Sequence, residues 1–124
     1  MFLLDTNVVS ELRRPKPHGA VLSWIAGIVD ADLHISTVTI GEIQAGIEIK
    51  RGQDAAKARE IEAWLDQVAA SYNVLAMDAR AFRTWARIMH VRSDHHIEDA
   101  MIAAIAVVHD LTVVTRNVSD FAPL

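Results

Sequence analysis

Four short apolar segments alternate with longer segments of helical periodicity along the whole chain of 124 residues. The short segments lie at Phe2–Leu4, Leu33–Ser36, Asn73–Met77 and Leu111–Thr115. Between them, apolar residues recur three or four positions apart, which is typical of helices with one buried face. Strands that alternate with helices form a parallel sheet that is covered on both faces. The sequence therefore predicts one α/β domain spanning residues 1–124.

The helix boundaries are predicted from capping residues and helix breakers. A short helix is expected to reach Arg13, because Pro15 and Pro17 follow it. A helix that opens at Thr39 is expected to end at Gly52, a residue type common at helix ends. The remaining helices are expected at about 19–29, 54–71, from Asp78 to a polar loop at 92–96, and 97–109.

The composition excludes several classes of site, and the net charge bears on whether the chain binds nucleic acid. The chain has no cysteine, so neither disulfides nor thiolate metal ligands are available. The longest apolar run, Ala100 to Val108, is too short to cross a bilayer, and no targeting segment is visible, so we expect a cytoplasmic protein without a membrane partner. The net charge of −4 argues against a nucleic-acid partner, but nine of the twelve basic residues are arginine. If four of the sixteen acids serve a metal site, the remaining twelve acidic side chains balance the twelve basic ones.

Four carboxylates lie where predicted elements begin or end. Asp5 and Asp120 follow the first and last strands, and the crevice beyond such strand ends is the usual functional site of an open α/β sheet. Glu42 and Asp99 are expected in the first turns of their helices, from which they reach the same edge. Carboxylates without cysteine suit Mg²⁺ or Mn²⁺, which activate water and neutralise charge in phosphoryl chemistry.

Each acid also has a purely structural interpretation. Thr39 and Glu42 have the spacing of a capping box, Asp5 can cap the first helix, and Asp120 can serve in a turn. Asp99 gains from the helix dipole, but an all-apolar segment follows it. A carboxylate in the first turn of such a buried helix needs a partner.

Four segments, in order and spanning nearly the whole chain, resemble the acidic motifs of PIN domains. They are Phe2-Leu-Leu-Asp-Thr-Asn-Val-Val-Ser10, Thr37-Val-Thr-Ile-Gly-Glu-Ile-Gln-Ala-Gly46, Glu98-Asp-Ala-Met-Ile-Ala-Ala104 and Val114-Thr-Arg-Asn-Val-Ser-Asp-Phe121. Within that family the sequence is most similar to the VapC-like toxins of toxin–antitoxin pairs. The resemblance implies a three-layer α/β/α fold with a central, mostly parallel sheet of four to five short strands.

The resemblance also implies Mg²⁺-dependent endoribonuclease activity, with Mn²⁺ able to substitute. The implied metal-binding and catalytic residues are Asp5, Glu42, Asp99 and Asp120, of which Asp5 and Asp99 bind most directly and Glu42 binds through water or positions the nucleophile. Thr6, Thr115 and Asn117 would orient the carboxylates or the scissile phosphate. The implied partners are RNA, a second copy of the chain, and an antitoxin that places an arginine in the acidic pocket and forms a hetero-oligomer with the toxin. Relatives run past the final Asp-Phe pair into another short strand, where this chain has only Ala122-Pro-Leu124.

Other residues are secondary candidates. Arg13, Arg14 and Lys16 flank the acidic site and are our first choice for phosphate contacts. His95 and His96 precede the third motif, although exposed loop histidines are common. Trp24, Trp64 and Trp85 are able to stack on bases, but their helical spacing favours core or dimer packing. An apolar helix with Val21, Leu22, Trp24 and Ile25 offers a groove for an antitoxin helix.

Three other functions are weighed against the nuclease. A haloacid-dehalogenase-type phosphatase needs a second aspartate where Asn7 stands. A receiver domain needs a phosphoacceptor, for which Asp78 is available, and a lysine in the region that Arg116 occupies. A binding module without catalysis would not need all four acids. A Mg²⁺-binding, phosphoryl-handling domain of the receiver or phosphatase kind is the alternative to the nuclease.

Overall fold

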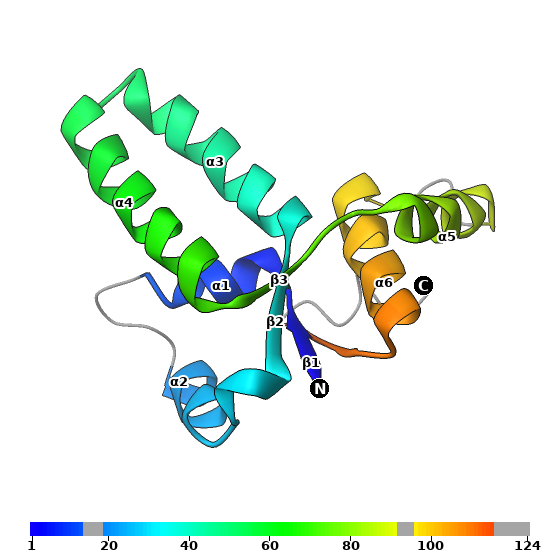
Figure 1. The fold of residues 1–124 in the computed structure, drawn as a ribbon. Coiled ribbons are helices and arrows are strands. Elements are labelled where there is room, and N and C mark those ends of the chain that lie inside the picture. Colours follow the sequence, from blue (N-terminus) through cyan, green and yellow to red (C-terminus); the bar gives the residue numbers. More distant parts are fainter. Residues whose placement is uncertain (14–18, 92–95, 116–124) are drawn as a thin grey trace.

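The strand β1 (Phe2–Leu4) lies inside a four-stranded parallel sheet (Figure 1). The computed structural model describes residues 1–13, 19–91 and 96–115, without the side chains of residues 20–22. The other strands are β2 (Leu33–Ser36), β3 (Asn73–Leu75) and β4 (Thr112–Val114), and the order in the sheet is β3-β2-β1-β4. Phe2 pairs with Leu33 on one side and with Thr112 on the other. The first and last strands of the described chain are therefore neighbours.

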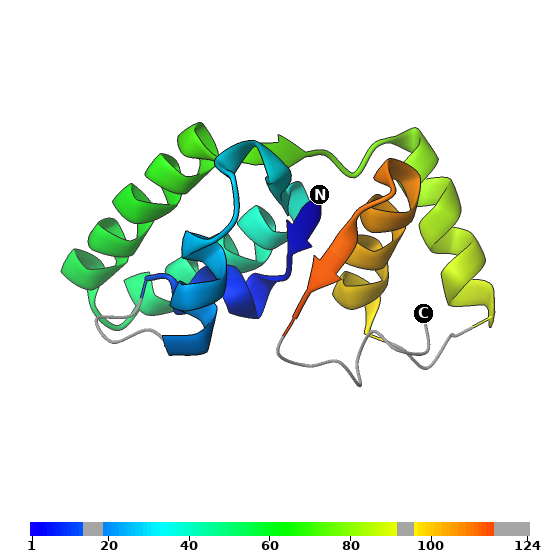
Figure 2. The ribbon, with the colours of Figure 1, turned by 90° about the horizontal axis from the view of Figure 1, so that it is seen from below.

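The side chains of β1 enter two different cores. Leu4 packs with Val8 and Ile35 in the core on one face of the sheet, whereas Leu3 packs with Ile102 and Ile105 on the other. Neighbouring residues of a strand point to opposite faces, and a strand that is apolar at consecutive positions is buried on both. This pattern gives the three-layer α/β/α arrangement that the resemblance implies (Figure 2).

Four helices form the first layer. α1 (Thr6–Glu11) and α2 (Gly19–Ala26) precede β2, and a short 3₁₀ helix at Asp30–Asp32 leads into that strand. α3 (Thr37–Arg51) and α4 (Ala55–Ser71) form an antiparallel pair, with Gly52 at the end of α3 and the Asp54 side chain capping α4 (Figure 1).

The second layer is the pair α5 (Ala79–Val91) and α6 (Ile97–His109), which lies on the opposite side of the sheet from α3 and α4 (Figure 2). Most residues from Ala100 to Ala106 are buried, which confirms that the apolar run is a core helix. Val107, which belongs to the same apolar run, has 64% of its surface exposed. The α6 helix carries Asp99 in its first turn.

All four predicted strands are found, although β3 and β4 are shorter than predicted. The helix α6 has its predicted bounds, and other helices differ at their ends. α1 stops at Glu11 and α2 at Ala26, a few residues before the predicted ends, whereas α3 begins at Thr37 rather than Thr39. The question of a further strand after Asp120 falls outside the described residues. None of the described helices has the length and apolar composition of a bilayer-spanning segment.

Candidate active site

Asp5 follows β1 at the carboxyl edge of the sheet, and its carboxylate is held by two elements. Its Oδ1 accepts a 2.8 Å hydrogen bond from the backbone N–H of Val8, so Asp5 is the N-cap of α1. Its Oδ2 accepts a 2.5 Å hydrogen bond from the hydroxyl of Thr115, which follows β4. The capping interpretation of Asp5 is correct, but it accounts for one oxygen only. The hydrogen bond from Thr115 holds the second oxygen.

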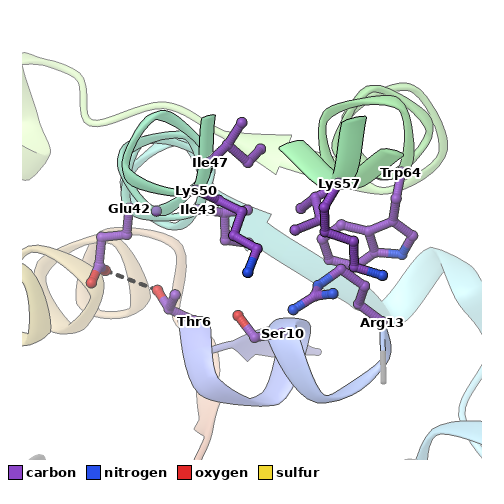
Figure 3. A pocket seen from close by; sticks show the side chains of 11 residues that line it. Thr6, Ser10, Arg13, Glu42, Ile43, Ile47, Lys50, Lys57 and Trp64 are labelled. Atoms are coloured by element: carbon purple, nitrogen blue, oxygen red, sulfur yellow. Dashed lines mark hydrogen bonds between the residues drawn. The ribbon is translucent and has the colours of Figure 1, made fainter. Parts of the chain in front are cut away.

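Glu42 extends from α3 toward the first turn of α1. Its Oε1 accepts a 2.8 Å hydrogen bond from the hydroxyl of Thr6 (Figure 3). The predicted capping box of Thr39 and Glu42 is wrong, because Ser36 is the N-cap of α3 and its Oγ accepts from the N–H of Thr39. Glu42 consequently lies in the second turn of the helix, not the first, and its carboxylate bonds to another helix.

A chain of hydroxyl groups supports Glu42. The Oγ1 atoms of Thr6 and Thr39 lie 3.0 Å apart, and Ser36 donates to Thr39 over 3.3 Å. An ionised carboxylate only accepts hydrogen bonds, so Thr6 uses its one hydroxyl proton on Glu42. The proton between the two threonines is therefore donated by Thr39, and the whole chain points toward Glu42. The buried end of β2 thus fixes the position of this carboxylate.

The surroundings raise the pKa of Glu42 above its usual value. Burial has the largest effect, and the hydrogen bond from Thr6 opposes it. The negative charges of Glu98, Asp99 and Asp5, in that order, raise the pKa further. Acids that follow β1 and begin α6 therefore act on the carboxylate that α3 carries. Asp99 is half-buried and Glu98 is exposed, as the sequence suggested.

The donor set fits a hard divalent cation. Asp5, Glu42 and Asp99 offer carboxylate oxygens, the ligands that Mg²⁺ and Mn²⁺ prefer. A cation among them would relieve the repulsion that raises the pKa of Glu42. Within residues 1–13, 19–91 and 96–115, no three acidic or histidine side chains lie close enough to enclose an ion. The predicted site residues Asp120 and Asn117 fall outside these ranges.

Some of the secondary candidates are described by the structure, and others lie outside the described residues. Arg13 is exposed just after α1, whereas Arg14, Lys16 and His95 lie outside the described residues. His96 is the exposed N-cap position of α6, without a side-chain capping bond. Trp24 and Trp64 pack against the core that contains Leu4, and Trp24 meets Phe2 edge to face. Trp85 meets Phe82 in the same geometry. These aromatic contacts favour packing over base stacking for Trp24 and Trp85.

The topology argues against the receiver alternative. Asp78, its candidate phosphoacceptor, follows the edge strand β3, and β2 lies between β3 and β1. The carboxylate of Asp78 instead accepts a 2.9 Å hydrogen bond from the N–H of Ala81 at the start of α5. Asp78 thus starts a helix away from Asp5.

Comparison with known proteins gives one consistent group. Residues 2–122 match the model of the PIN domain family. The chain is 35% identical to the VapC ribonuclease Y4jK of Sinorhizobium fredii, over 98% of this chain and 90% of that protein. It is 31% identical to toxin FitB of Neisseria gonorrhoeae, over 98% of this chain and 91% of that protein. The crystal structure of FitAcB from Neisseria gonorrhoeae superimposes with a TM-score of 0.86 and 29% identity, covering 99% of this chain and 92% of that one.

Proposed function

The chain belongs to the PIN domain family, and from that premise we propose that it is a metal-dependent endoribonuclease that acts as the toxin of a toxin–antitoxin pair. Its substrate is single-stranded or loop RNA, and it works in the cytoplasm. Similarity over almost the full length to a ribonuclease and to a toxin supports both parts of the proposal.

The observation that carries the proposal is the pair of carboxylates oriented by threonines at one edge of the sheet. Thr115 holds Asp5, and Thr6 holds Glu42. The negative charges of Glu98, Asp99 and Asp5 raise the pKa of Glu42, so these acids repel its ionised form. This repulsion costs stability in a partly buried site. A bound cation would offset the repulsion, which is a reason for the protein to retain these acids.

In this function, water attacks a phosphodiester phosphorus. A bond forms between the water oxygen and phosphorus, the bond from phosphorus to the leaving ribose oxygen breaks, and that oxygen takes up a proton from solvent. Glu42 accepts the proton of the attacking water, a role for which a raised pKa makes its carboxylate a better base. Thr6 keeps the carboxylate oriented through its hydrogen bond. The threonine contact of Asp5 likewise fixes the direction of its charge before substrate arrives.

Asp5 and Asp99 would hold the metal directly, with Glu42 reaching it through water and Asp120 completing the site. A bound Mg²⁺ or Mn²⁺ offsets the charge of the reacting phosphate and lowers the pKa of a coordinated water. Thr6, Thr115 and Asn117 act as positioning residues. Arg13, Arg14 and Lys16 are the proposed phosphate contacts beside the acids.

An antitoxin and a second copy of the chain are the proposed protein partners. On α2, Trp24 and Ile25 turn partly into the core, and nearby Val29 leaves 68% of its surface exposed. This end of the first layer is the proposed groove for an antitoxin helix.

On the other layer, Phe82 has 45% of its surface exposed and Val107 has 64%. Burial of these two side chains in a homodimer would remove apolar surface from water.

The test is cleavage of RNA by protein freed from any bound partner. Purified chain is incubated with a mixture of transfer, ribosomal and messenger RNA in millimolar Mg²⁺ or Mn²⁺, and in chelator. New RNA ends are then sequenced. We expect metal-dependent ends that are absent with Asp99→Asn protein and suppressed when the native partner is added back. Equal cleavage by wild type and Asp99→Asn would refute the proposal.

A further inference from the structure

A pocket of about 470 Å³ lies between α1, α3 and α4, directly beside the candidate active site. The pair formed by Thr6 and Glu42 lies at one end of it (Figure 3). Ile43, Ile47 and Trp64 contribute apolar surface to its lining. A cavity of this size is in the range that takes small ligands or parts of larger ones.

Three cationic side chains from three separate segments converge on this pocket. Arg13 comes from the end of α1, Lys50 from the last turn of α3 and Lys57 from the start of α4 (Figure 3). Two of the three lysines in the chain therefore line one pocket, although the chain as a whole carries a net charge of −4. We refer to it below as the basic pocket.

The positive charge of the basic pocket is largely uncompensated. Arg51, next to Lys50 in sequence, pairs with Glu48 and Glu62, none of which lines the pocket. Neither Lys50 nor Arg13 has an ion pair within the described part of the chain, and Lys57 has one long, exposed contact of 3.5 Å to Glu60. Exposed pairs of this kind neutralise little charge. The pocket is thus free to bind an anion beside the acidic site.

We propose that the basic pocket binds one nucleotide of the RNA strand, immediately next to the phosphate that is cleaved. The inference rests on the proposed nuclease function and names a subsite for it. Arg13, Lys50 and Lys57 bind the backbone phosphate of that nucleotide, and its base packs against the apolar lining with Trp64. Since Glu42 repels phosphate, the cleaved phosphate lies at the metal end of the site and the neighbouring phosphate lies in the basic pocket. The two ends together define the path of the strand from the metal end of the site to the basic pocket.

The first test removes charge. Lys50→Gln and Lys57→Gln are combined, and the control is Arg59→Gln, which removes one charge from the same helix as Lys57 but about 200° around its axis. Binding of a fluorescent 12-nucleotide single-stranded RNA is measured in chelator at several salt concentrations. We expect the double variant to bind about tenfold more weakly. Its plot of log affinity against log salt should be shallower by about 0.7, the change for one single-strand phosphate contact.

The second test fills the pocket without changing its charge. Gly46 lines the pocket, and a Cβ built there meets no atom within 4 Å. Gly46→Leu should therefore fold normally and block the nucleotide. Gly41→Leu is the matched control, since Gly41 is also open in α3 but does not line the pocket. In cleavage assays the blocking variant and the double lysine variant should raise KM with little change in kcat.

The outcomes separate the subsite from the nuclease function. If the lysine and Gly46 variants bind RNA as well as their controls, the subsite is refuted even where wild type cleaves RNA. If wild type binds RNA through these residues but cuts none with Mg²⁺ or Mn²⁺, the nuclease proposal fails, whereas nucleotide binding in the basic pocket is supported. If RNA binding is unchanged but the variants lose an acidic partner protein, the pocket is a protein-binding site and our inference is wrong.

Discussion

The hydroxyl of Thr6 lies 2.8 Å from Oε1 of Glu42 and joins the first residue of α1 to the second turn of α3. The hydrogen bond stabilises the ionised form of Glu42 and lowers a pKa that burial and three other carboxylates raise. Thr6 therefore influences both where Glu42 points and the pH at which it gains a proton.

Replacement of Thr6 by valine should lower the rate of RNA cleavage by about ten- to a hundredfold, because a hydrogen bond to a charged group is lost. The pKa of Glu42 should rise further, which moves the acid limb of the pH–rate profile to higher pH. Thr6→Ser keeps the hydroxyl and should restore most of the rate. The measurement is kcat/KM against pH for the three proteins. A rate loss with an unmoved acid limb would mean that Thr6 does not act through Glu42.

Replacement of Glu42 by glutamine should stabilise the metal-free protein at neutral pH. The folded pKa of Glu42 is raised above 4.5, so the folded protein binds a proton more tightly than the unfolded chain does. Stability conferred by this group is present at low pH and is lost as pH rises through the folded pKa. The melting temperature of Glu42→Gln should thus exceed that of wild type at pH 7 in chelator, and the difference should shrink below pH 4.5. A difference that is constant with pH would rule out this electrostatic origin.

Asp99→Asn should lower metal-dependent RNA cleavage by about a hundredfold or more, since it removes a proposed metal ligand. Asp99 stands in the first turn of α6, and asparagine preserves the size of the side chain. We therefore expect an unchanged circular dichroism spectrum. Glu98→Gln removes the adjacent, exposed acid and is the matched control, for which a much smaller loss is expected.

Asp5 has two separable functions that melting experiments can distinguish. Asn is about as good an N-cap as Asp, whereas Ala costs about 1 kcal/mol. In chelator, Asp5→Asn should melt close to wild type and Asp5→Ala below both. Added Mg²⁺ binds only the folded acidic site and should raise the melting temperature of wild type alone. An equal Mg²⁺ response of wild type and Asp5→Asn, at fixed ionic strength, would remove Asp5 from the metal site.

The sequence predicted the layers of the fold because β1 and α6 carry unambiguous patterns. Consecutive apolar residues before Asp5 require burial on both faces of the sheet, and the run after Asp99 requires a core helix. Each requirement follows from the residues of a single segment and does not depend on which other segments pack against it. The positions of Asp5 and Asp99 at the ends of these segments followed directly.

The environment of Glu42 was not predictable in the same way. Ser36 and Thr39 are both good capping residues, and the spacing of Thr39 and Glu42 fits a capping box. Which of these two residues caps α3 cannot be decided from α3 alone, because Thr6, from another helix, donates the hydrogen bond that the carboxylate of Glu42 accepts. The basic pocket was missed for the same reason. Lys50 and Lys57 belong to two helices, and only the packing of α3 on α4 brings them together.

The placement of β1 between β2 and β4 also has a consequence for the order in which the fold forms. Asp5 and Thr115, which holds its carboxylate, are 110 residues apart in the sequence. A contact between such distant residues forms late in folding, because the long chain between them must first be brought together. A chain in which only β1, β2 and β3 have paired still lacks β4, the strand that leads to Thr115. The support of the Asp5 carboxylate therefore depends on the docking of β4 against β1.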